Sequence, residues 1–360
     1  MKRRLALGIL SGVILVLVLM PLTSCTSTPS EARLQGAGST FANPIYQKWF
    51  SLYMPDHANV KLDYQSIGSG GGIKAIQGQT VDFAGTDAPL TDDQIKQSPS
   101  EMLHIPTVMG GVVMTYNIPS IGSTVLKFSG DVIAGMYLGT IKKWNDPKIT
   151  ADNPGVTLPD ADIATVHRSD GSGTTYCFAD YLSKVSPEWS SKVGKGTSVN
   201  WPGGIGSKGS EGVTGSVKQT PNSIGYVELI YAMQNNLSYA DVKNADGVFV
   251  KASLDSVTAA AASAASNMPS DLRVSITNAP GKDAYPISTF TWILVYKDQK
   301  DQAKGEALAK FLWWGIHDGQ KAASGIGYAP LPGQVVQKDE EKIKAMMNNG
   351  KAVYTAMATM

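Results

Sequence analysis

The segment AYPISTFTWILVYK, residues 284–297, carries the strongest β-strand signal in the chain. It is a long apolar run that is rich in β-branched and aromatic residues. A second extended run, HIPTVMGGVVMTYN, covers residues 104–117 and is interrupted by Gly110 and Gly111. One run lies early in the chain and the other lies late, so both are candidates for segments that cross between two lobes. The segment between them would form one lobe, and the two flanking segments would together form the other.

Short apolar strands alternate with helical stretches along the chain from Leu34 onward. The patterns predict strands at 60–64, 81–86 and 222–229, and helices at 41–54, 91–97, 129–139, 174–185, 254–268 and 303–317. This alternation predicts an α/β fold with largely parallel sheets. The Ala-rich helix at 254–268 is expected to lie in solvent on the middle lobe.

The composition is that of an ordinary globular protein. The chain has 360 residues, of which 42% are hydrophobic and 17% are charged, which suffices for two domains with cores of their own. The formal net charge of +1 includes Lys2, Arg3 and Arg4, which lie in a segment that we expect to be removed. Removing these three from the 31 basic residues leaves 28 against 30 acidic ones, a net charge of −2. This balance argues against nucleic acid as a partner, because nucleic acid requires a basic face.

The N-terminus has the pattern of a lipoprotein signal peptide over residues 1–24. The basic start MKRR is followed by an apolar run, Leu5–Met20, for which a plain transmembrane helix is the alternative. The run has about 16 residues, short of the ~20 needed to span hydrocarbon. It ends in LTSC, which resembles a bacterial lipobox, so we expect lipidation at Cys25 and a flexible tether over 25–33. Such a protein is anchored to the membrane and works outside the cytoplasm.

The cysteines and histidines predict neither a disulfide nor a metal site. With Cys25 lipidated, Cys177 is the remaining cysteine, and its neighbours Tyr176 and Phe178 favour a buried apolar role. The four histidines are scattered without the spacing of a zinc motif: His57, His104, His167 and His317. We therefore expect no metal and no cofactor.

Four turns share an unusual content of small and hydroxyl residues: GAGSTF (36–41), IGSGGG (67–72), GTDAP (85–89) and RSDGSGTT (168–175). Each follows a predicted strand, and three of them open a helix. Ligands of open α/β sheets bind beyond the carboxyl ends of the strands, where helix N-termini present unpaired N–H groups. Ser and Thr hydroxyls add donors, and Arg168 adds a positive charge. Each turn alone is a weak signal, but the four together favour one shared oxyanion pocket.

Two acidic residues in these turns each allow two interpretations. Asp170 is the N-cap of the following helix, a salt-link partner that orients Arg168, or both, since the two roles are compatible. Asp87 either shapes its turn or faces the anion as a hydrogen-bond acceptor. His167 precedes Arg168 in a strand and should face the opposite side, so we expect it to pack or to lie at the surface. The segment GGIGSKGS (203–210) lacks the pattern of a nucleotide-binding P-loop.

The four turns, together with GVVMTYNIP, YLGTIKKWNDP, SIGYVEL and YPISTFTWILV, resemble the high-affinity phosphate-binding proteins of bacterial ABC phosphate importers. The resemblance covers nearly all of the chain after the signal segment. It implies a two-lobed periplasmic-binding-protein fold, class II-like, with two crossover segments and the ligand in the cleft between the lobes. Lobe I would comprise 34–107 and 287–360, and lobe II would comprise 108–286.

The same resemblance implies the ligand contacts. The donors would be Thr40, the backbone N–H of Phe41, Ser69, Arg168, Ser172, Gly173 and Thr174. Asp87 would be the acceptor, and Asp170 would orient Arg168. The implied protein is a monomer without catalytic residues that captures inorganic phosphate and delivers it to a membrane permease with its ATPase subunits.

Three other functions compete with this one. A phosphomonoesterase would use Ser172 or Ser69 as its nucleophile, but it would lack a convincing base. A receptor for sulfate, molybdate or a phosphonate is the second alternative. Asp87 separates it from a phosphate receptor, because a fully deprotonated oxyanion has no proton to offer a carboxylate. A sensor or adhesin that retains the fold is the third.

Overall fold

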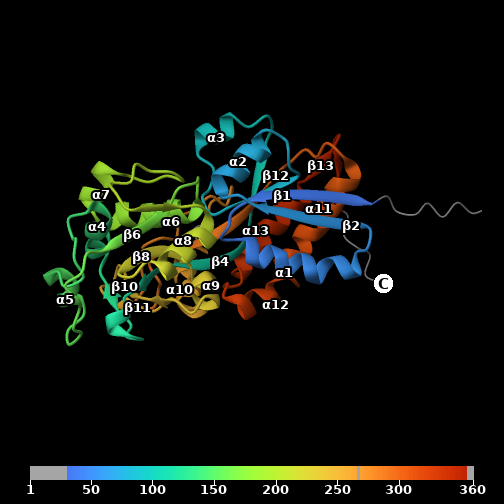
Figure 1. Ribbon diagram of the computed structural model, residues 1–360. Helices are drawn as coiled ribbons and strands as arrows, with labels where there is room; N and C mark the ends of the chain where they lie inside the picture. The colour runs from blue at the N-terminus through green and yellow to red at the C-terminus, as the bar shows by residue number, and fades with distance from the viewer. Residues whose placement is uncertain (1–30, 266–267, 355–360) are drawn as a thin grey trace, which may run out of the picture. The chain divides into compact units, whose positions relative to one another are not determined.

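The computed structural model describes residues 31–265 and 268–354, and nine of the strands in these ranges form one sheet (Figure 1). The order along the sheet is β2 (Val60–Ser66), β1 (Ala32–Gly38), β3 (Phe83–Thr86), β12 (Ser288–Tyr296), β4 (Met102–Asn117), β8 (Ser223–Glu228), β6 (Ala164–Arg168) and β7 (Ile205–Ser207), with β9 (Ser238–Tyr239) also paired to β4. The predicted signal peptide, the lipidation of Cys25 and most of the predicted tether lie outside the described residues. None of the helices in the described part of the chain is long and apolar enough to span a bilayer.

The long strand β4 belongs to both halves of this sheet. Its first part, up to Gly111, pairs antiparallel with β12, and its last part, from Val112 to Asn117, pairs antiparallel with β8. The strand β4 changes its partner at Gly110 and Gly111, the two glycines that interrupt the run in the sequence. A Cβ atom on Gly110 would lie 2.4 Å from the ring of Phe41, so only glycine lets this ring pack against the strand.

The direction of the strands differs from the prediction in the centre of the sheet. The outer strands are parallel: β1 runs with β2 and β3, and β6 runs with β7 and β8. The central strand β12 is antiparallel to both β3 and β4. The prediction of largely parallel sheets is therefore wrong at the centre, because the two crossing segments run through it in opposite directions.

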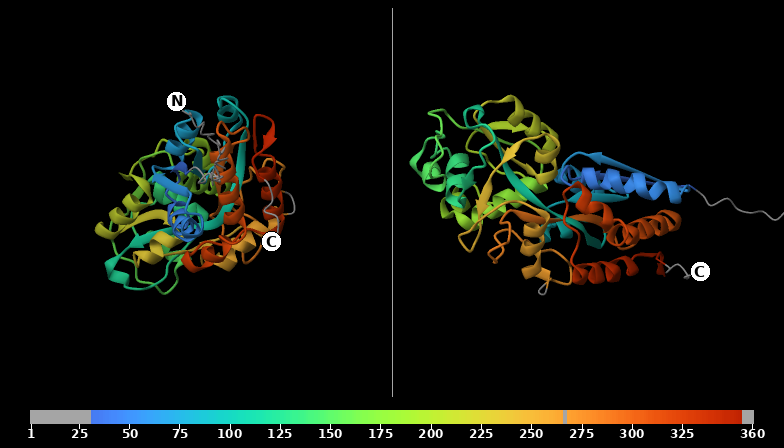
Figure 2. Two further views of the ribbon diagram at one scale, coloured as in Figure 1. Left: turned by 90° about the vertical axis from the view of Figure 1, so that its right-hand side faces the viewer. Right: turned by 90° about the horizontal axis from the view of Figure 1, so that it is seen from below.

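The helices and the remaining strands complete the two halves. The helices are α1 (Asn43–Tyr53), α2 (Ser69–Gln77), α3 (Asp92–Lys96), α4 (Gly130–Leu138), α5 (Pro147–Asp152), α6 (Gly173–Val185), α7 (Pro187–Lys192), α8 (Gly209–Gln219), α9 (Leu229–Gln234), α10 (Leu254–Ala265), α11 (Gln302–Ile316), α12 (Gln320–Ala323) and α13 (Gly333–Lys344). The short strands are β5 (Lys127–Phe128), β10 (Asp241–Lys243), β11 (Phe249–Val250), β13 (Met347–Asn348) and β14 (Lys351–Ala352). In Figures 1 and 2 the green and yellow middle segment gathers at one end, and the blue and red flanking segments gather at the other.

The Ala-rich helix α10 differs from its predicted place. Val257 and Ala261 are buried, and the helix packs against β4 and β12 instead of lying in solvent. Small alanine side chains allow this close approach of a helix to the sheet. The periodicity identified the helix, but it did not identify the face that the helix buries.

Aromatic clusters hold the helices of each half against the sheet. In the middle segment Phe178 of α6 stacks on Tyr226 of β8, with ring centroids 4.3 Å apart. In the other half Trp49 of α1 meets Phe311 of α11 edge-on. Burying rings of this size against strands fixes the start of α6 and of α1, and both starts adjoin the predicted pocket.

Candidate anion site

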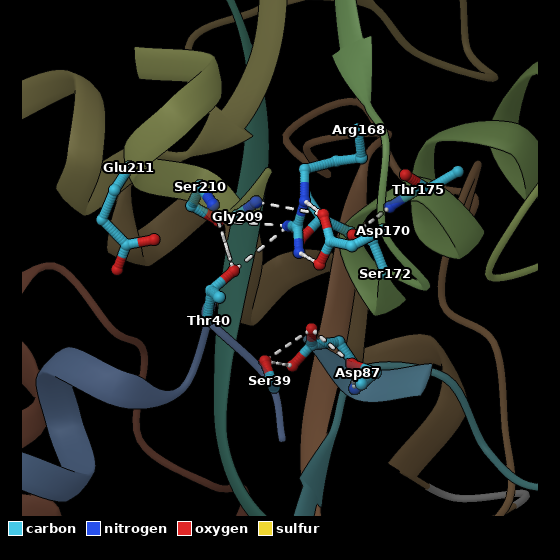
Figure 3. A network of polar contacts seen from close by, with 12 residues as sticks. Ser39, Thr40, Asp87, Arg168, Asp170, Ser172, Thr175, Gly209, Ser210 and Glu211 are labelled. Atoms are coloured by element: carbon cyan, nitrogen blue, oxygen red, sulfur yellow. Dashed lines mark hydrogen bonds and ion pairs between the residues drawn. The ribbon is translucent and has the colours of Figure 1, made fainter. Parts of the chain in front are cut away.

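The predicted turns meet where the two halves of the protein face each other (Figure 3). The turn before α2 touches the turn after β6: the N–H of Gly70 donates to the carbonyl oxygen of Gly171 at 2.9 Å. A Cβ atom on Gly70 would lie 2.9 Å from the Cα of Gly171. Gly68 has a φ of +81°, and a Cβ atom there would lie 2.3 Å from Asp170. These glycines allow two backbone turns to close directly on each other.

Arg168 lies at the centre of the site, with only 1% of its side chain exposed. Its Nε and Nη2 donate to the two carboxylate oxygens of Asp170 at 2.8 and 2.6 Å. Burial raises the pKa of Asp170, but the hydrogen bonds and charge of Arg168 outweigh it and hold that pKa below its usual value. This two-point contact fixes the plane of the guanidinium group.

The alternative interpretation of Asp170 as the cap of α6 is wrong. The N-cap is Ser172, whose hydroxyl oxygen accepts from the N–H of Thr175 at 3.1 Å. Asp170 instead accepts from the N–H of Gly209 at 3.0 Å, which ties it to the start of α8. The carboxylate thus links Arg168 to a second helix.

The remaining guanidinium nitrogen, Nη1 of Arg168, faces three hydroxyl groups. These belong to Thr40 at 3.1 Å, Ser210 at 3.4 Å and Thr174 at 3.5 Å. A guanidinium group can only donate, so each hydroxyl oxygen accepts from it and keeps its own proton for another partner. Arg168 therefore orients hydroxyl groups from both halves of the protein.

Several backbone N–H groups at the site have no acceptor. Among the described residues, nothing accepts from the N–H of Phe41, Gly173 or Thr174. The last two belong to the first turn of α6, where N–H groups lack helical partners and carry a partial positive charge. A Cβ atom on Gly173 would lie 2.6 Å from the hydroxyl of Ser69 and 2.7 Å from Asp87, so glycine lets this helix start reach between them.

Asp87 is a fully buried acid of the site. It accepts from the hydroxyl of Ser39 at 2.6 and 2.7 Å, from Thr291 at 2.8 Å and from Ser69 at 3.3 Å. Burial raises the pKa of Asp87 to about 7, although the hydrogen bond from Ser39 lowers it, and the nearby Glu228 raises it further. The carboxyl group is thus poised to change its charge near neutral pH.

The structure brings together all nine residues that the sequence nominated for the site, and it adds others. Ser39 lies inside a quoted turn, and Ser210 lies inside GGIGSKGS, which repeats the pattern of small residues between a strand and a helix. That repeated pattern was a usable signal for Ser210. Glu228 and Thr291 lie within or at the end of buried strands, and no local pattern marks them.

The other residues considered from the sequence form no hydrogen bonds with the side chains of the anion site in the described part of the chain. His167 stacks on Trp201 with ring centroids 4.6 Å apart, as expected for a packing residue. Cys177 is buried, and this burial raises the pKa of its thiol well above the usual value. In residues 31–265 and 268–354, no group of three His, Cys, Asp or Glu side chains is placed to hold a metal ion.

Comparisons with known proteins agree on one family. The model of the PBP superfamily domain matches residues 23–318. The phosphate-binding protein PstS of Xylella fastidiosa is 46% identical over 321 residues, covering 88% of this chain and 87% of that protein. The phosphate-binding protein PstS of Pasteurella multocida is 43% identical over 329 residues, covering 91% and 95%. The solved structure of a high affinity periplasmic phosphate-binding protein, PfluDING, bound with phosphate, has a TM-score of 0.66 at 19% identity and covers 85% of this chain and 92% of that one.

Proposed function

We propose that this chain, which belongs to the PBP superfamily and within it to the phosphate-binding proteins PstS, captures inorganic phosphate outside the cytoplasm. It then delivers the phosphate to an ABC-type phosphate permease. This family consists of binding proteins and not of enzymes. Its two-lobed periplasmic-binding-protein fold accounts for a sheet whose halves share β4.

The observation that carries this function is the set of donors around one buried guanidinium group. We assign the phosphate contacts to Thr40, the N–H of Phe41, Ser69, Arg168, Ser172, Gly173 and Thr174. Asp170 orients Arg168 through two hydrogen bonds. Unpaired N–H groups at the start of α6 supply donors that a tetrahedral anion satisfies.

Asp87 is the proposed selectivity residue. Phosphate near neutral pH keeps at least one P–OH group, which donates to a carboxylate, whereas sulfate has none. An ionised Asp87 already accepts from Ser39, Thr291 and Ser69. Facing sulfate, however, it would receive no hydrogen bond from the ligand and would lie next to a second negative charge. The phosphate function therefore uses Asp87 as an acceptor for the P–OH group, a proton that sulfate cannot supply.

We assign lobe I to 34–107 and 287–360, and lobe II to 108–286. The change of partner along β4 and the start of β12 at Ser288 support crossovers near these boundaries. The contact between Gly70 and Gly171 then joins the two lobes across the cleft. We further propose that the mature chain is a monomer anchored by lipid at Cys25, with the permease and its ATPase subunits as partners.

Calorimetry on the chain from Glu31 tests this function with phosphate, sulfate, molybdate and methylphosphonate. We expect tight binding of phosphate alone. Tight binding of sulfate or molybdate would assign the protein to another oxyanion. A parallel assay with p-nitrophenyl phosphate tests the phosphatase alternative, and turnover that is lost in Ser172→Ala or Ser69→Ala would overturn the binding function.

A further inference from the structure

A second carboxyl group, Glu228, borders the proposed phosphate site. It is the last residue of β8, and its side chain is buried, with only 1% of the residue exposed. Its Oε1 lies 2.6 Å from the hydroxyl oxygen of Thr174. Its Oε2 is buried and has no hydrogen-bond partner among the described residues. An ionised carboxylate with one oxygen unpaired in the interior is unfavourable, so this geometry favours the neutral acid.

Burial raises the pKa of Glu228, although the hydrogen bond from Thr174, the charge of Arg168 and the nearby hydroxyl of Ser210 lower it. The cation that acts on it is Arg168, which already forms two hydrogen bonds with Asp170. Asp87, the residue after β3, adds a like charge, so ionised Asp87 and Glu228 would both repel the bound anion. The other titratable groups close enough for the charge of Glu228 to act on them are Tyr231, Tyr328 and Cys177, and burial raises the pKa of each.

The hydroxyl of Thr174 has one proton and therefore two possible arrangements. When Glu228 is ionised, this proton points to its Oε1, and the hydroxyl oxygen accepts from Arg168. The hydroxyl then offers only a lone pair to the pocket, and a lone pair repels an anion. When Glu228 is protonated, it donates from Oε1 to Thr174 and frees the hydroxyl proton to donate to a phosphate oxygen.

Resting on the proposed function, we propose that Glu228 is a positioning residue whose protonation turns the Thr174 hydroxyl toward bound phosphate, so that, at pH values where Glu228 is ionised in the free protein, binding is accompanied by uptake of one proton from solvent at Glu228. The proton goes onto the carboxylate, and no covalent bond to the ligand forms or breaks. Phosphate binding is then linked to pH through a residue that need not touch the ligand.

The central experiment compares wild type with Glu228→Gln. Glutamine keeps the shape of the side chain and donates permanently from its amide to Thr174, as the protonated acid does. Calorimetry at pH 8, in buffers of different ionisation enthalpy, counts the protons taken up with phosphate. We expect wild type to take up more protons than the glutamine variant, with the difference approaching one.

The pH profile gives a second readout. From pH 6 to 8.5 the phosphate affinity of wild type should fall relative to that of Glu228→Gln, by up to about tenfold per pH unit once Glu228 ionises in the free protein. The titration of phosphate affects both proteins and cancels in this ratio, and making the comparison in an Asp87→Asn background removes the titration of Asp87, which is coupled to the charge of Glu228. Thr174→Val, which removes the hydroxyl, should abolish the extra proton uptake as well. The matched control is Glu211→Gln on α8, whose exposed carboxylate accepts from Tyr231 at 2.8 Å and should leave the ratio unchanged.

The outcomes separate this proposal from the function on which it rests. If wild type does not bind phosphate, both fail. If wild type binds phosphate but takes up the same number of protons as Glu228→Gln, with parallel pH profiles, the role of Glu228 alone is overturned. If the glutamine variant folds poorly, the proton count of Thr174→Val decides, and a count equal to that of wild type refutes the proposal.

Discussion

Replacing Asp87 with asparagine should let the site accept sulfate while it keeps much of its affinity for phosphate. The wild-type carboxylate is fully buried and faces the proposed anion position. Asparagine keeps an oxygen for Ser39 and Thr291 and adds an amide donor that a sulfate oxygen can accept from. Removing the repulsion between the buried carboxylate and sulfate and adding one hydrogen bond amounts to about 3–5 kcal/mol, or roughly 10²–10⁴-fold in sulfate affinity.

The pKa of Asp87 gives the same substitution a pH signature. Its ordinary value is 3.8, and in the folded protein it is about 7. The folded chain thus holds the proton more tightly than the unfolded chain does, so the contribution to stability is complete below about pH 4 and is lost as the pH rises to 7. A shift of about 3 units corresponds to about 4 kcal/mol. Between pH 4 and 8, ligand-free wild type should lose that much stability relative to Asp87→Asn.

Competitive titration of phosphate and sulfate from pH 5 to 8 is the assay, with denaturant unfolding of the free proteins alongside. Wild type should itself begin to bind sulfate toward pH 5, where Asp87 is neutral and donates. Asp160→Asn is the matched control, because Asp160 is an exposed partner of Lys143. If Asp87→Asn excludes sulfate as fully as wild type does, the acceptor role of Asp87 is wrong and the shape of the pocket must explain selectivity.

The remaining predictions concern three other residues. Arg168→Ala should weaken phosphate binding by about 2–5 kcal/mol, and Arg168→Lys should restore it only in part because lysine lacks the two-point geometry; unchanged calorimetric affinity in the alanine variant would remove Arg168 from the site. Cys25→Ala should leave phosphate binding intact and abolish membrane retention, and a variant that still fractionates with the membrane would contradict lipidation there. Asp339 is buried, neither of its carboxylate oxygens has a hydrogen-bond partner in the described part of the chain, and burial raises its pKa, so its ionisation costs stability as pH rises. Asp339→Asn should therefore raise the unfolding free energy at pH 8 by about 1–3 kcal/mol, and equal denaturant midpoints would refute this.

The parts of the site that could be predicted were those whose residues lie close together along the chain. Arg168 and Ser172 stand in a turn whose glycines and hydroxyls indicate an anion site without knowledge of the fold. Glu228 could not be found in this way, because its role depends on β8 lying beside α6, which is a tertiary contact.

The errors have the same physical origin. Asp170 and Ser172 both carry a side-chain oxygen that can cap a helix, and the sequence does not show which of them lies at the residue where the helix begins. The strand 284–297 was found from its apolar run. Its direction in the sheet depends on the path of the chain between the lobes, which periodicity does not encode.

The backbone contact between Gly70 and Gly171 affects how quickly the protein releases its bound anion. The lobes meet there through backbone alone, and any side chain would act as a spacer at that point. A methyl group at either position would hold the lobes slightly apart and shorten the residence time of the anion, while the groups that recognise it stay in place. Substitutions at Gly70 or Gly171 thus change the dissociation rate of the anion without changing which anion is bound.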